Sequence, residues 1–334
     1  MRFIFLLFFL ISGFSIAQIK SREQIIVEFN KNKKNDSIID FNLANSNDSW
    51  SIYKLAYSLD ANNVMFKCTN DIKYINYNVR LINRLIQNSR FSTNIQTSQF
   101  KDGFKTWVNY SHSDKNYYGK EYPLFEFFAW RYVTQTLRII KEHKLVNLNK
   151  DYNNILDFTV ANIINKWEAR KYNNLTNNIH MYSHFASVNY DLYKLSNNEK
   201  YLKDFNKFWE KFNSIYSIKN SNIYWKSGDT VQDVSHGNAV VGLIIRLYED
   251  GFIDNQLINL LINTTKNKII IGQNFSKTID GLGIDKNKRV LTDGFMKLGK
   301  YDSELMLFFS NQKLNKETIY FRNNQYLSNQ LYFK

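Results

Sequence analysis

Residues that interrupt helices are scarce in this chain, and this scarcity limits the folds open to it more than any other feature. Pro123 is the only proline among 334 residues, and glycine occurs only 12 times. A β-sandwich needs a turn about every 8–12 residues, and turns draw heavily on these two residue types. The sequence therefore favours long helices joined by Asn-rich loops, in one large domain or two closely packed ones.

Several segments repeat their apolar residues at the helical period. Amphipathic helices are predicted around 72–86, 155–167, 201–212 and 257–262. The segments 124–140 and 239–248 are instead apolar nearly all round, as expected of helices that are buried on both sides. These two should form an inner layer, with the amphipathic helices outside it.

The pattern of helices predicts an all-α protein of the α/α-toroid class, an incomplete barrel of helical hairpins. Residues 68–74 and 195–201 form a loose internal echo, because each joins an apolar helix to an amphipathic one through polar capping residues. Glycines cluster at 268–300, which predicts either a long loop or a few short strands there. No Pro-, Gly- or Ser-rich linker interrupts 40–325, so we expect one domain over 18–334.

The first residues have the features of an export signal. Arg2 precedes the apolar run 3–11, and Ser15-Ile16-Ala17 fits the small-x-small pattern of a signal peptidase site. We therefore expect a signal peptide at 1–17 and a mature protein that is exported to the periplasm or secreted. The apolar run is shorter than the roughly 20 residues that a membrane anchor needs, so no anchor is expected. Cys68 is the only cysteine, which excludes an internal disulfide.

The segment 232–238 places an acid, a hydroxyl and an imidazole directly before the apolar helix 239–248. In one interpretation Ser235 or Asn238 caps the helix, and His236 is a satisfied polar side chain. In the other, Asp233, His236 and Asn238 line a site at the mouth of the toroid, where His236 acts as a general base near neutral pH.

A second polar segment, 177–184, holds His180 and His184, which share one face if the segment is helical. Such a pair can bind zinc, but no Glu follows His180 directly, so the H-E-x-x-H pattern is not met and no metal is expected. The alternatives are that both histidines are structural or that they line a polar pocket beside Asn178 and Tyr182.

Aromatic and charged residues between the predicted helices are further candidates. Trp107, Trp225 and Tyr301 have faces on which a sugar ring can stack, although Tyr and Trp in helical proteins usually belong to the core. Arg131 lies in the apolar helix 124–140, where a charge is costly unless it is paired. We expect it to meet Glu126, Glu121 or an anionic ligand, a structural pair being favoured.

The net charge of +14 bears on the partner. Nucleic acid is disfavoured, because the chain has an export signal, no compact Lys/Arg stripe and no known nucleic-acid module. An acidic polysaccharide is the more natural partner of an exported basic protein. We expect a monomer that needs no cofactor.

The motif Asp233-x-Ser235-His236-Gly237 resembles those of α/α-toroid polysaccharide lyases and related uronate-acting proteins, of the glucuronan lyase, alginate lyase and glucuronyl C5-epimerase types. The resemblance extends over most of the mature chain. It includes the two hairpins, the Asn-x-x-His segment and the late stretches 293–295 and 301–302. It departs from the pattern at Gln232, where an acidic pair with the next residue is often seen.

The resemblance implies β-elimination on a uronic acid, in a secreted polysaccharide lyase. The catalytic candidates are then His236 as the base, Tyr301 or Tyr182 as the acid, and His184, with Asn178, His184 or Arg131 neutralising the carboxylate. The remaining candidates bind substrate: His180, Trp107, Trp225, Asp233 and Asn238.

Other functions remain open for the same fold. One is a glycoside hydrolase with two carboxylates such as Asp233 and Glu126. Others are a uronyl C5-epimerase and a glycan-binding protein without catalytic activity. Fold alone does not choose among them.

Overall fold

A computed structural model describes residues 19–111, 115, 117–171, 173–285, 291–312 and 316–334. Helices dominate it. They are α1 (Arg22–Ala44), α2 (Ser49–Thr69), α3 (Lys73–Asn88), α4 (Pro123–Glu142), α5 (Asn149–Thr159), α6 (Asn165–Ala169), α7 (Ile179–Ser196), α8 (Glu199–Ile215), α9 (Val234–Glu249), α10 (Asn255–Thr264), α11 (Ser303–Ser310) and α12 (Lys316–Tyr332).

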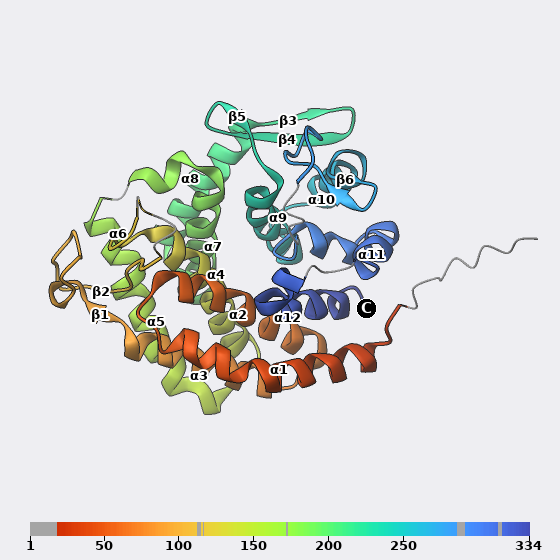
Figure 1. Cartoon of the computed structure of the whole chain (residues 1–334). Helices are drawn as coiled ribbons and strands as arrows, with labels where there is room; N and C mark the ends of the chain where they lie inside the picture. The colour runs from red at the N-terminus through yellow and green to blue at the C-terminus, as the bar shows by residue number, and fades with distance from the viewer. Residues whose placement is uncertain (1–18, 112–114, 116, 172, 286–290, 313–315) are drawn as a thin grey trace, which may run out of the picture.

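The inner helices form a closed ring. α2 packs on α4, α4 on α7 and α7 on α9, and α9 contacts the 3₁₀ helix η6 (Phe295–Lys300). η6 contacts α12, which packs along α2 and so closes the ring. The remaining long helices lie outside it: α1 and α3 against α2, α5 against α4, α8 against α7, and α10 against α9 (Figure 1). The predicted all-α, α/α-toroid class is confirmed.

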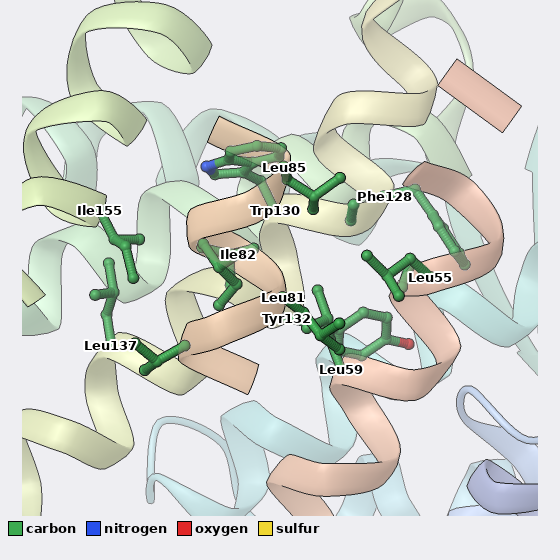
Figure 2. Close-up of a cluster of buried hydrophobic side chains, with 14 of the residues drawn as sticks. Leu55, Leu59, Leu81, Ile82, Leu85, Phe128, Trp130, Tyr132, Leu137 and Ile155 are labelled. Atoms are coloured by element: carbon green, nitrogen blue, oxygen red, sulfur yellow. The ribbon is translucent and has the colours of Figure 1, made fainter. Parts of the chain in front are cut away.

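The interior of the ring wall is apolar, which explains why these sequences form two helical layers. Leu55 and Leu59 of α2 meet Leu81 and Leu85 of α3, and Trp130 of α4 lies beside them (Figure 2). A second cluster fills the other half of the ring, from α7 and α8 to α11. Burying a side chain of this size stabilises the fold by roughly 1.5–3 kcal/mol, so the wall supplies the main stabilisation.

Short strands lie in some of the connections between the helices. β3 (Tyr216–Lys219), β4 (Asn222–Ser227) and β5 (Thr230–Val231) form an antiparallel sheet between α8 and α9. Two further pairs are β1 (Arg90–Phe91) with β2 (Lys105–Thr106), and β6 (Ile270–Ile271) with β7 (Asn274–Phe275). The other helical segments are short and are not α-helices. The 3₁₀ helices are η1 (Ser92–Asn94), η2 (Val146–Leu148) and η4 (Asn173–Asn177), and the π-helices are η3 (Val160–Ile164) and η5 (Thr265–Ile269).

The predicted helices all form, with boundaries a few residues wider than their apolar cores. Both echoing hairpins, α2–α3 and α7–α8, turn at an asparagine in the left-handed conformation, Asn70 with φ 56° and Asn197 with φ 54°. The described residues of 268–300 include the short strands β6 and β7, as one of the two alternatives had it, together with the 3₁₀ helix η6. The sheet β3–β5 was not predicted, although the branched and aromatic run 223–225 lies between the turn residues Asn220-Ser221 and Gly228-Asp229, which together signal a hairpin.

The expected signal peptide at 1–17 lies outside the described residues, so export stays a prediction. Among the helices of the described ranges, none combines the length and the apolar character that crossing a membrane requires.

One buried ion pair holds the outer layer to the inner one. Lys166 of α6 lies 2.7 Å from the Glu126 carboxylate of α4, which also accepts a hydrogen bond from Trp167 Nε1 at 2.7 Å. Both charged side chains are almost fully buried. The hydrolase hypothesis that used Glu126 as a catalytic carboxylate therefore lacks a basis, because Glu126 faces Lys166 inside the wall.

Replacing Lys166 by alanine should lower the free energy of unfolding by about 3–5 kcal/mol, because it leaves the Glu126 carboxylate buried without its partner. Chemical denaturation of the variant measures the change. Lys203→Ala, at an exposed position on α8, is the control and should stay within about 0.5 kcal/mol. A Lys166→Ala protein as stable as the control would contradict the role given to this pair.

Candidate active site

A pocket of about 260 Å³ opens at one mouth of the ring, and we call it the mouth pocket. The inner helices α2, α4, α7, α9 and α12 all lend side chains to it, as does Asp293 just before η6, so its shape depends on the ring being closed. Its lining is Tyr53, Tyr57, Leu124, Phe128, His180, His184, Ser235, His236, Asn238, Ala239, Asp293 and Arg322. The pocket combines aromatic walls with histidines, a carboxylate and a guanidinium.

The N-terminus of α9 holds His236 in place. Asp233 is the N-cap: one carboxylate oxygen accepts the His236 backbone N–H at 3.1 Å, and the other lies 2.6 Å from His236 Nδ1. Partial burial alone would raise the pKa of Asp233, but the hydrogen bonds and charge of His236 hold it well below its ordinary value. Asp233 thus caps the helix and orients the imidazole at once.

His180 and His184 project from the first turns of α7 into the same pocket. Their rings are 6.2 Å apart, and His180 stacks on His236 with centroids 4.1 Å apart. Burial, with a smaller contribution from His236, lowers the pKa of His180 to about 3. Burial and the nearby Arg131 hold the pKa of His184 well below its ordinary value. Both imidazoles are therefore neutral near neutral pH, and the Nδ1 atom of each is buried without a hydrogen-bond partner among the described residues.

Asp293 lines the pocket, and side chains of the inner helices α4 and α12 hold its carboxylate in place. Its carboxylate pairs with Arg131 of α4 at 3.2 Å and accepts hydrogen bonds from Tyr132 at 2.8 Å and Gln325 at 2.8 Å. Burial alone would raise the pKa of Asp293, but the charge of Arg131 and then that of Arg322 lower it. The predicted partners of Arg131, Glu126 and Glu121, are corrected: its partner is Asp293.

The backbone around Asp293 packs directly on α9, and glycines permit the approach. A Cβ on Gly294 would lie 2.1 Å from the Asn238 carbonyl oxygen, and one on Gly242 would lie 2.4 Å from the Asp293 carbonyl oxygen. Asn238 Oδ1 accepts the Phe295 backbone N–H at 2.9 Å. Asn238 thus lines the pocket and also anchors the segment that carries Asp293.

Aromatic side chains form the opposite wall. Tyr53 stacks on Phe128 with centroids 4.1 Å apart, and Tyr57 donates a hydrogen bond to Tyr53 at 3.3 Å. Arg322 of α12 donates to the Tyr57 hydroxyl at 2.6 Å and lies over its ring. This wall offers a face for a sugar ring beside a positive charge.

The structure brings together His236, His180, His184 and Asn238 of the residues singled out in the sequence. Arg131 does not line the pocket itself but pairs with Asp293, which does. Among the described residues, no group of three or more His, Cys, Asp or Glu side chains is placed to hold a metal ion.

Three other candidates lie away from the mouth pocket. The Tyr301 hydroxyl lies 3.2 Å from Glu249 and 3.4 Å from the Tyr332 hydroxyl. Tyr182 packs on Phe208 in the core. Trp107 is fully buried. The acid role expected of either tyrosine is therefore corrected, because neither hydroxyl reaches the pocket.

Two more candidates, Trp225 and Asn178, belong to the neighbourhood of the pocket. Trp225 lies in β4, and a Cβ on Gly237 would lie 3.2 Å from its ring. Asn178 caps α7 and accepts a hydrogen bond from Ser227 at 3.2 Å. Both lie between the mouth pocket and a second cavity described below.

Sequence reasoning missed Tyr53, Tyr57 and Arg322 and gave Asp293 no role. Tyr53 and Tyr57 are four residues apart in a helix, which is a weak signal because such pairs also occur in cores. Arg322 lies in a stretch rich in Asn and Gln, where nothing distinguishes it from a surface residue.

The fold and the pocket define an α/α toroid with a polar, aromatic-walled pocket at its mouth. No protein-family model matches the chain, and no curated protein matches it in sequence. The structure is similar to two solved structures of inactive variants of the α-1,6-mannanase GH76A of Salegentibacter sp. HEL1_6, in complex with α-1,6-mannotriose and α-1,6-mannotetrose. The identities are 11% and 10%, and the TM-scores are 0.44 and 0.41; each match covers 82% of this chain and 74% of the other.

These similar structures correct one expectation. Both are structures of a mannanase, which is a hydrolase, and neither is of a polysaccharide lyase or a uronate-acting protein, so the lyase expectation is not carried further. At these identities the likeness concerns the fold alone, and no residue role is transferred from the mannanase to this chain.

Replacing Gly294 by alanine should displace the Asp293 segment from α9, because the added Cβ would collide with the Asn238 carbonyl. We expect a loss of about 1–3 kcal/mol in the free energy of unfolding, as for overpacked sites, and a mouth pocket that no longer binds ligand. Gly103→Ala is the matched control, since a Cβ there meets nothing within 4 Å. Equal stability of the two variants would contradict this close approach.

The neutral state of His180 predicts a pH-dependent stability. The unfolded chain protonates this histidine below about pH 6.5, whereas the folded protein does so only near a pKa of about 3. Below about pH 6.5 only the unfolded chain takes up this proton, so the free energy of unfolding falls by about 1.4 kcal/mol per pH unit as pH falls. Between about pH 6.5 and pH 5, His180→Gln should lose about 2 kcal/mol less stability than the original protein.

The matched control for this measurement is His143→Gln, which removes an exposed imidazole after α4 and should keep the full pH dependence. Urea unfolding at the two pH values gives the comparison. If the His180→Gln protein shows the same loss as the original, the imidazole is not neutral in the folded state.

Proposed function

We propose that the protein is a glycan-active enzyme of the glycoside hydrolase class, which cleaves an acidic polysaccharide at the mouth pocket. The observation that carries this proposal is the meeting of a proton-transfer group and an ionised carboxylate in one aromatic-walled cavity. His236, held by Asp233, lies on one side, and the Asp293 carboxylate lines the same cavity. Glycoside hydrolysis needs one group that gives a proton and one that faces the positive charge of the transition state.

His236 is suited to proton transfer. Its Nδ1 is occupied by the Asp233 carboxylate at 2.6 Å, so Nε2 is the nitrogen left to exchange a proton with a glycosidic oxygen or a water. The side chain is half exposed, so a substrate can reach it. The Asp233 carboxylate holds the imidazole through Nδ1 and leaves Nε2 facing the substrate, the arrangement that a general acid and base requires.

Asp293 is suited to the second role. The Arg131 charge keeps its carboxylate ionised, and the Tyr132 and Gln325 hydrogen bonds fix its orientation. A fixed negative charge stabilises the oxocarbenium-like transition state of glycoside cleavage without any reorganisation at the moment of reaction. In this account Asp293 replaces Glu126 as the second carboxylate.

The acidic nature of the substrate is supported by charge. Arg322 lies in the wall of the pocket, where its planar guanidinium can pair with a sugar carboxylate. The whole chain carries +14, which attracts a polyanion over a longer range. The proposal includes export, on the pattern of residues 1–17, and action as a monomer.

The test is an assay of the mature protein on a panel of acidic and neutral polysaccharides, with detection of new reducing ends. His236→Ala should lower kcat by about 100-fold or more, the usual worth of a positioned acid or base. Asp293→Asn should lower kcat strongly as well, because it removes the fixed charge. His143→Ala, far from the pocket, is the control and should keep full activity.

Two results would overturn the proposal. One is the absence of new reducing ends on every substrate of the panel, together with measurable binding, which would indicate a glycan-binding protein. The other is full turnover by purified, folded His236→Ala protein, which would remove the proton-transfer role from this histidine.

A further inference from the structure

A second cavity, of about 630 Å³, lies beside the mouth pocket and is the larger of the two. It lies between the end of α8 and the sheet β3–β5. The sheet itself is at the top of Figure 1. We call it the sheet groove and define it by six of its lining residues: Lys211, Tyr216, Tyr224, Trp225, Lys226 and Ser227.

The two cavities share a wall. Ile179 lines the sheet groove, and the next residue, His180, lines the mouth pocket. The hydrogen bond from Ser227 Oγ to Asn178 Oδ1, at 3.2 Å, joins β4 to the start of α7 along the boundary. A chain that passes over this boundary leaves one cavity and enters the other.

Near the start of α9, residues of the two cavities again lie next to each other. His236 lines the mouth pocket, whereas Trp225 lines the sheet groove, and the Trp225 ring lies directly below Gly237. The hydrogen bond from the Gln232 backbone N–H to the Trp225 carbonyl, at 3.1 Å, ties the groove wall to the Asp233 segment. The groove therefore has a fixed position relative to the proposed proton-transfer group.

The lining of the sheet groove combines aromatic rings with positive charge. Tyr224 and Lys226 flank Trp225 in β4 and so lie on one face of the sheet, whereas Tyr216 pairs with Trp225 and lies on the other face. Tyr224 is partly exposed. Lys226 is exposed, and Lys211 donates a hydrogen bond to the Thr176 carbonyl. None of the described residues that line the groove is acidic. Such a surface selects a ligand with an apolar ring face and a negative group.

We infer that the sheet groove is a second glycan-binding subsite, which holds an anionic sugar unit of the same polysaccharide chain whose neighbouring unit enters the mouth pocket. The inference rests on the proposed function for the identity of the chain. The ring face of Tyr224 stacks the sugar, and Lys226, on the same face of the sheet, pairs with its carboxylate or sulfate. Two subsites of this kind favour long substrates over single sugar units.

The sharpest test compares two charge reversals on the same sheet. Lys226→Glu changes the groove, whereas Lys219→Glu makes the same charge change at an exposed position of β3 outside it. With the polysaccharide that the protein hydrolyses, Lys226→Glu should raise KM about tenfold or more with kcat unchanged, as for a removed interface contact. With a single-unit chromogenic glycoside, which fills only the mouth pocket, KM should not change. Lys219→Glu should match the original protein on both substrates.

A binding measurement tests the groove even if no polysaccharide is hydrolysed. The proteins are run through native gels that contain either polygalacturonate or neutral dextran. The original protein and Lys219→Glu should be retarded by polygalacturonate, and Lys226→Glu and Tyr224→Ala should lose most of that retardation. Tyr224→Ala leaves the net charge unchanged, so its effect reports loss of stacking.

Three results would overturn the inference. The first is equal retardation of Lys226→Glu and Lys219→Glu, which would show only general charge attraction. The second is an equal rise of KM on the long and the single-unit substrate. The third is retardation by dextran that Tyr224→Ala removes and Lys226→Glu does not, which would assign a neutral sugar to the groove. A failure of hydrolysis with intact groove binding would instead reject the proposed function alone.

Discussion

The buried pair between Arg131 and Asp293 is the interaction on which the rest of the site depends. Arg131 belongs to α4, and the Asp293 segment packs on α9, so the pair connects two inner elements of the ring. Gln325 of α12 adds a third element by donating to the same carboxylate at 2.8 Å. A buried charge left without its partner costs about 3–5 kcal/mol. The pair therefore stabilises the closed ring and holds Asp293 at the pocket, which makes the position of this carboxylate a consequence of the fold.

At the N-terminus of α9, too, one interaction serves both the fold and the site. The unpaired N–H groups of a helix start require an acceptor, and Asp233 supplies one while its second oxygen holds His236 Nδ1 at 2.6 Å. Because capping fixes the carboxylate, the imidazole is oriented before any ligand arrives. The neutral imidazole of His180 stacks on the imidazole of His236 and supports it from the other side. Preorganisation of this kind removes the need to reorganise polar groups during reaction.

The sequence alone was sufficient for the helices and for half of the site. Helical periodicity located α4 and α9 as inner helices, and the polar residues before α9 indicated Asp233 and His236, because local signals determine both. Arg131 and Asp293 are far apart in the chain, so their pairing depends on ring closure and has no local signal. Tyr301 and Tyr182 show the converse: a tyrosine in a loop or at a helix start looks available, but packing directs both hydroxyls away from the pocket. The reaction class was mistaken because the same residue types serve elimination and hydrolysis.

The central claim is that water is added across a glycosidic bond in the mouth pocket. Reaction of the mature protein with its polysaccharide in heavy-oxygen water, followed by mass spectrometry of the products, tests it most directly. The account predicts one heavy oxygen atom at each new reducing end, and release of such products about 100-fold more slowly by the His236→Ala protein. Products that lack the heavy oxygen, or that carry a double bond in place of the added water, would contradict it.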